Sequence, residues 1–138
     1  MVVSKMLTIK TSGDCDIVDI TSYVANMAAG AGIHSGTVTV FITGSTAGVT
    51  TIEYEPGLIA DLKAAWERIA PQGIEYKHNQ AWGDGNGHAH VRASLLGPSL
   101  VIPFVDKKLV LGTWQQIVVI DFDNRARSRQ VFIQIMGE

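Results

Sequence analysis

The sequence predicts an α+β fold: a single compact domain with a mainly antiparallel, β-sandwich-like sheet and two principal helices. Its 138 residues, 46% of them hydrophobic, are enough for one ordinary core. Short segments rich in β-branched residues recur along the chain between turn signals, while only two segments space their apolar residues as a helix does. Because no linker, repeat or low-complexity stretch divides the chain, we expect one domain over residues 1–138.

The first half is expected to contain four strands and both helices. The strands are predicted at 5–11, 16–20, 35–42 and 50–54. Thr21 or Ser22 can cap the first helix, which stops at the glycines 30–32. The second helix begins at Pro56 and ends before Pro71, and its apolar residues share one face: Leu58, Ile59, Leu62, Ala65, Trp66 and Ile69.

The second half of the chain is predicted to be β-structure throughout. The predicted strands are 88–95, 99–104, 108–112, 116–121 and 127–135. Turn signals separate them at Gly97-Pro98, Asp106-Lys107 and Asp123-Asn124. Strands that follow one another through short turns pair in antiparallel fashion, with the helices packed on one side.

Charge and cysteine content narrow the class of protein. A formal charge of −2 provides no electrostatic footprint for nucleic acid or an anionic membrane. The stripe of Arg125, Arg127 and Arg129 is expected to be solvated or to pair across a subunit interface, with ligand binding as the alternative. The lone Cys15 excludes an internal disulfide, and neither a signal peptide nor a membrane-spanning stretch is recognisable. We therefore expect a cytoplasmic protein without nucleic-acid or membrane partners.

Three of the four histidines fall within residues 78–90 and suggest a metal site. On a strand, His88 and His90 would project from one face, and the glycines at 83, 85 and 87 would let the chain bring His78 back toward them. Imidazoles suit zinc, which needs three protein ligands in an open site. The alternative is a set of surface histidines hydrogen-bonded within a polar loop.

Three charged residues are candidates for catalysis. Arg92 would share the strand face of His88 and His90 and suits a phosphate or carboxylate, unless it pairs with a surface acid. Asp84 can be a ligand, a partner that fixes an imidazole, or a turn former. Glu53 can be a further ligand of the metal or act as a general base. Glu55 is instead placed to stabilise the N-terminus of a helix with its negative charge.

A run of small and hydroxylated residues spans positions 44–51 between two predicted strands. Backbone N–H groups in a glycine-containing turn form a concave anion site, although a plain connection is the alternative. No lysine follows the second glycine, so this is not a Walker loop. Gln115 is a further candidate, either for binding a heterocycle or as a surface amide. The candidate substrate-binding residues are Ser45, Thr46, Gly48, Thr50, Thr51 and Gln115.

Four segments together resemble the YjbQ-like family, described as secondary thiamine-phosphate synthases. They are GSTAGVTTIEYEPGLIADL, HNQAWGDGNGHAHVRASLLGPSL, IPF and LGTWQQIVVIDFDNRARSR, and the match covers nearly the whole chain. The resemblance implies a compact α+β domain, commonly a trimer, with His78, Asp84, His88 and His90 in the site and residues 44–51 and 109–115 lining it. The chain departs from the family at Asp106-Lys107-Lys108, where a glycine is expected in the turn.

The activity implied by the resemblance is the joining of a pyrimidine diphosphate to thiazole phosphate, with loss of diphosphate. Such a reaction needs orientation and stabilisation of the departing charge more than covalent catalysis. A diphosphate normally brings magnesium, whereas three imidazoles favour zinc. Two alternatives remain open: a zinc-dependent hydrolase of a small phosphorylated substrate, with Glu53 or Asp84 as base, and a non-catalytic oligomer that binds a metal or small ligand.

Overall fold

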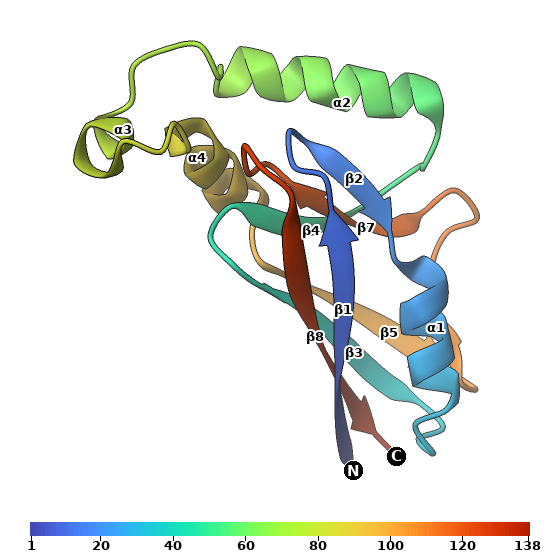
Figure 1. Ribbon diagram of the computed structural model, residues 1–138. Coiled ribbons are helices and arrows are strands. Elements are labelled where there is room, and N and C mark those ends of the chain that lie inside the picture. The colour runs from blue at the N-terminus through green and yellow to red at the C-terminus, as the bar shows by residue number, and fades with distance from the viewer.

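The computed structural model describes all residues 1–138 and contains eight strands and four helices (Figure 1). In chain order these are β1 (Val2–Thr11), β2 (Asp16–Asp19), α1 (Thr21–Ala29), β3 (Gly36–Thr43), β4 (Ala47–Ile52), α2 (Pro56–Ile69), α3 (Lys77–Trp82), α4 (Gly87–Leu96), β5 (Ser99–Val105), β6 (Lys108–Leu109), β7 (Gln116–Asp121) and β8 (Arg127–Gly137). None of the helices is long and apolar enough to cross a membrane.

Two antiparallel sheets form the predicted sandwich. The larger has the strand order β1-β8-β3-β5-β6 and the smaller β2-β7-β4. The main core lies between them and includes apolar residues of α1, while a second cluster joins β7 to α2 and α4. Figure 1 shows α2 lying across the smaller sheet, with α3 and α4 at one end of the molecule. The sandwich thus has helices over its smaller sheet and none over the outer face of the larger.

The prediction of a strand at 88–95 was wrong, because this segment forms helix α4. Its buried residues Ala89 and Ala93 are four apart and pack in the cluster beneath α2, with Leu96 at its edge. Gly97, at φ 98°, ends the helix. The alternation of polar and apolar residues along 88–95 obscured this i, i+4, i+7 spacing. Helix α3 was also not predicted, and the fold therefore has four helices where two were expected.

Several element boundaries also differ from the prediction. β4 begins at Ala47, so most of the expected loop at 44–51 is strand, and β6 covers only two residues. Helix α1 begins where expected, but no side chain caps it; Thr21 Oγ1 instead donates to Asp19 Oδ1 at 2.6 Å. Helix α2 follows the prediction, with Glu55 accepting hydrogen bonds from the N–H groups of Gly57 and Leu58.

Candidate functional site

Two of the three clustered histidines meet where α3 packs on α4. The rings of His78 on α3 and His90 on α4 have centroids 4.2 Å apart and planes inclined by 42°. Gly83, in the left-handed region at φ 67°, ends α3 and turns the chain back. At Gly87 a Cβ would collide with Tyr76, so the close approach of the two helices requires glycine there. The predicted return of His78 is therefore correct with respect to His90.

A cleft of about 220 Å³ opens beside His90, between α4 and the turn that joins β3 to β4. Its lining includes Gly44 and Ser45 from the turn and Ser94 from α4. Gly44 and Ser45 are exposed, whereas Thr46, the next residue of the turn, is buried. The cleft therefore brings an imidazole together with two serines and a glycine-containing turn, which is a lining suited to a small anion.

The surroundings of His90 favour the neutral imidazole. Partial burial, followed by the neighbouring His78, lowers the pKa of His90, while Asp84, Asp123 and the Ser45 carbonyl act in the opposite direction. An anion placed in the cleft would favour the protonated imidazole. Binding of a phosphate group is thus expected to be coupled to proton uptake by this ring.

His88 lies away from this pair, which corrects the expectation that it shares a face with His90. Successive helical residues are rotated by about 100°, so positions two apart project in nearly opposite directions. His88 is 1% exposed and its Nδ1 has no hydrogen-bond partner. Burial, followed by the nearby Arg92 guanidinium, lowers its pKa, while Glu67 opposes the shift. The structure therefore places His88 in the core beneath α2.

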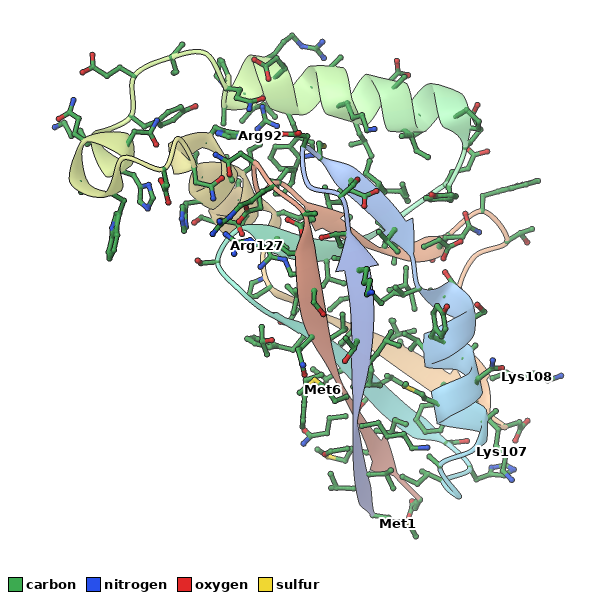
Figure 2. All side chains as sticks on the ribbon, viewed as in Figure 1. Met1, Met6, Arg92, Lys107, Lys108 and Arg127 are labelled. Atoms are coloured by element: carbon green, nitrogen blue, oxygen red, sulfur yellow. The ribbon has the colours of Figure 1, made fainter.

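Arg92 also points away from the cleft. Figure 2 shows it beneath α2, where its Nε donates to the Ala70 carbonyl at 3.0 Å and one terminal nitrogen donates to Glu67 at 2.8 Å. Its guanidinium carbon lies 6.0 Å from the centre of the Phe122 ring. The expectation that Arg92 shares a face with both histidines holds for His88, four residues away, and is wrong for His90, because α4 is a helix. The contacts of Arg92 join α4 to the end of α2.

A buried ionic network that the sequence analysis missed supports the β3–β4 turn. Arg129 donates to both carboxylate oxygens of Asp121, at 2.7 and 2.9 Å, and also to the hydroxyl of Thr46. Thr46 in turn donates to Asp123, which also pairs with Arg127 at 3.1 Å. Such a bidentate arginine–carboxylate pair fixes geometry as well as charge. These hydrogen bonds of Thr46 therefore fix the turn that carries Ser45 to Arg129 on β8 and to Asp123, which follows β7.

The network changes the interpretation of two earlier observations. The arginine stripe is neither solvated nor free for an interface at Arg129, because that side chain is buried against Asp121. The Thr46 hydroxyl, expected to bind an anion, already donates a hydrogen bond to Asp123 and accepts one from Arg129. A signal was present in the sequence: Asp121 and Asp123 flank Phe122 at the end of an apolar strand, where a buried charge requires a partner.

The remaining predicted residues do not gather around the histidines. Gly48 is packed against Leu96 and the Gly97 carbonyl, and Thr50 is half-buried within β4. Thr51 accepts a hydrogen bond from Gln115 at the opposite end of β4. Glu53 also lies at that end, in the lining of a second cavity of about 340 Å³. The set expected to form one site is thus divided between the two ends of a strand.

The donors present in one chain do not complete the predicted three-imidazole metal site. No group of three or more His, Cys, Asp or Glu side chains is arranged to hold a metal ion. Asp84 Oδ1 lies 3.7 Å from His78 Nδ1, so this carboxylate is beside the histidine pair. The local donor set is therefore two imidazoles with one exposed carboxylate nearby.

The fold and this site define a small α+β domain with two curled antiparallel sheets and a polar, histidine-lined cleft at one end of the sandwich. Comparison with known proteins gives the family. The chain belongs to the family described as UPF0047 protein YjbQ-like, whose model matches residues 5–138.

Relatives and solved structures of this family match along nearly the whole chain. A UPF0047 protein of Archaeoglobus fulgidus is 37% identical over 94% of this chain and 98% of its own length, and YugU of Bacillus subtilis is 32% identical over 96% and 98%. The crystal structure of a YbjQ-like protein of unknown function from Sulfolobus solfataricus superimposes with a TM-score of 0.95, at 33% identity, covering 100% and 99% of the two chains. A YjbQ/UPF0047 protein of Clostridium acetobutylicum has a TM-score of 0.87 and 36% identity, over 96% and 99%.

Proposed function

We propose that the cleft beside His90 binds a small phosphorylated metabolite and that the protein transfers a group there, joining a pyrimidine diphosphate to thiazole phosphate. The observation that carries the proposal is the contact between His78 and His90 at a cleft lined by Gly44 and Ser45. Hydroxyl and backbone donors suit phosphate oxygens, and two imidazoles can share one proton next to them. The reaction itself is taken from the resemblance to secondary thiamine-phosphate synthases.

In this proposal the chain contributes binding and charge stabilisation. Ser45 and the N–H groups of the β3–β4 turn would hold phosphate oxygens, and the Arg129–Asp121 pair beneath them would keep the turn in place. A protonated His90 would stabilise the negative charge that accumulates on the departing diphosphate. Because the surroundings lower the pKa of His90, the bound anion would have to supply the field that protonates it.

The test is to incubate the protein with both precursors and measure thiamine phosphate. Wild type should form the product, and His90→Gln should lose at least about a hundredfold of the rate if the imidazole carries the charge. The control is His34→Gln, an exposed histidine outside the cleft, which should keep the rate. Absence of product with wild type would reject the synthase. Phosphate release from one precursor alone would support a hydrolase, and affinity without turnover a binding protein.

We further propose that a divalent metal reaches this cleft in one of two ways: as zinc held by His78 and His90, or as magnesium carried by a diphosphate. Two imidazoles leave zinc short of a full ligand set, so the remaining donors would come from Asp84, water or the ligand. Zinc titration should then show weak binding that is lost in His78→Ala and His90→Ala and kept in His88→Gln. Equal loss in all three variants would instead support the three-imidazole site.

We also propose that the protein assembles as a homotrimer in the cytoplasm. The outer face of the larger sheet has no covering layer, and one row across it consists of Met6, Phe132, Phe41 and Ser99. The next two rows are likewise uncharged: Ser4, Gln134, Thr39 and Val101, then Val2, Met136, Thr37 and Pro103. An uncharged sheet face of this size is typical of an interface. The free Cys15 agrees with a reducing compartment.

A further inference from the structure

We propose that the second cavity, at the end of β4 opposite the histidines, binds a small organic cation with a quaternary ammonium group. Glu53, Tyr54 and Trp114 line it, and its volume of about 340 Å³ is at the lower end of the range for small-ligand sites. The lining combines aromatic rings and carboxylates and includes no basic residue. The proposal is independent of the reaction suggested for the histidine cleft.

Trp114 provides an open aromatic face on a fixed loop. Its side chain is 72% exposed, although burial of an indole is strongly favourable. The loop around it is held by its own amides: Gly112 N donates to Gln115 Oε1 at 3.0 Å, and Gln115 Nε2 donates to Thr51 at 3.0 Å. These bonds fix the loop that carries the exposed indole, and a cation is attracted to the face of an indole.

Tyr54 adds a second ring whose polar atoms are already satisfied. Its backbone N–H donates to Gln116 Oε1 at 2.9 Å, and its hydroxyl donates to the Ile17 carbonyl at 3.0 Å. Gln116 in turn donates to the Thr113 carbonyl at 3.3 Å, which connects Tyr54 to the tryptophan loop. The ring of Tyr54, which is 43% exposed, therefore offers mainly its aromatic surface to the cavity.

The two carboxylates in the lining have different roles. Glu55 caps α2, and the N–H groups of Gly57 and Leu58 hold its pKa below the ordinary value. It therefore stays ionised, and its carboxylate oxygens are already used in these hydrogen bonds. Glu53 makes no hydrogen bond or ion pair with the rest of the chain and is exposed. A negative charge without a partner beside two aromatic faces matches a cation that is poorly hydrated, and a quaternary ammonium has this property.

The experiment titrates the ¹⁵N-labelled full-length protein with choline and with its neutral carbon isostere, 3,3-dimethylbutan-1-ol, and follows the indole N–H signals. Choline should shift the Trp114 signal saturably and bind at least about tenfold more tightly than the isostere, since only choline gains the charge-dependent attraction. Glu53→Gln should weaken choline by about fivefold and leave the isostere unchanged. Trp114→Leu should abolish binding, whereas Trp82→Leu, which removes an equally exposed indole on α3, should have no effect.

Equal affinities for the two probes, no saturable shift, or an unchanged choline affinity in Glu53→Gln would overturn the proposal. Acrylamide quenching of the Trp82→Leu variant, in which Trp114 is the exposed indole because Trp66 is buried, provides a second check. Trp114 should be accessible to the quencher in the assembled protein. If it is shielded, a second copy of the chain covers this surface and the cation site is rejected.

Discussion

At the scale of single residues, the buried histidine of α4 makes the clearest prediction. His88 is almost fully buried, and its neighbours include the positive Arg92, so the charged imidazole is disfavoured in the folded protein. The unfolded chain then binds the proton more readily than the folded one. The contribution of the neutral ring to the free energy of unfolding is therefore fully present above the ordinary histidine pKa near 6.5. As pH falls below that value, the free energy of unfolding should decrease, by at most about 1.4 kcal/mol per pH unit for each such histidine.

Urea denaturation between pH 5 and 8 measures this dependence. His88→Gln should flatten the slope below pH 6.5, even if its absolute stability is lower. His90 also has a lowered pKa, so replacing both histidines should reduce the pH dependence of the free energy of unfolding further. A slope in His88→Gln equal to that of wild type would show that this ring does not titrate with folding.

At the scale of elements, the β5–β6 hairpin explains the departure from the family pattern. Val105 pairs with Lys108, which leaves a two-residue loop of Asp106 and Lys107. Both residues have positive φ, 52° and 65°, as in a type I′ turn, where glycine is favoured at the second position. The glycine expected there is absent, and the turn keeps its type with a lysine in a strained conformation.

Lys107→Gly should therefore stabilise the protein by about 0.5–1 kcal/mol, since relief of strain exceeds the added entropy of the unfolded chain. The hydrogen bond from the backbone N–H of residue 107 to the His34 carbonyl is retained by glycine. Thermal denaturation tests this, with Lys108→Gly, in the paired strand, as a destabilising control. A lower melting temperature for Lys107→Gly would contradict the argument.

The histidine segment shows where element prediction failed. Residues 88–95 alternate polar and apolar side chains well enough to imitate a strand, and periodicity alone does not separate the two. The helix is selected by packing, because Ala89 and Ala93 are buried in the cluster that joins α4 to β7 and α2. The error carried over to the site, since His88 and His90 share a face only on a strand.

At the scale of the whole molecule, the uncovered face of the larger sheet is the surface proposed as the trimer interface. Sedimentation should give about three times the chain mass of 14.9 kDa. Phe41→Glu places a charge in the row shared with Met6 and Phe132 and should dissociate the assembly. Tyr23→Glu, an exposed aromatic on α1, is the control and should leave the mass unchanged. A monomeric wild type, or a trimer that survives Phe41→Glu, would reject the interface.

The sequence by itself determined the α+β class, the antiparallel sandwich, and most strands together with α1 and α2. These features depend on local periodicity, turn residues and caps, which act within a few positions of one another. It also singled out residues 78–90 and 44–51 as candidates for a functional site.

Only the tertiary structure decided which of these side chains meet. It brought His78 to His90, buried His88 and Arg92 beneath α2, and enclosed Arg129 with Asp121 under the β3–β4 turn. It also separated Gln115 and Glu53 from the histidines by the length of β4. The physical reason is that burial and ion pairing depend on contacts between residues far apart in the chain, and no local pattern records them.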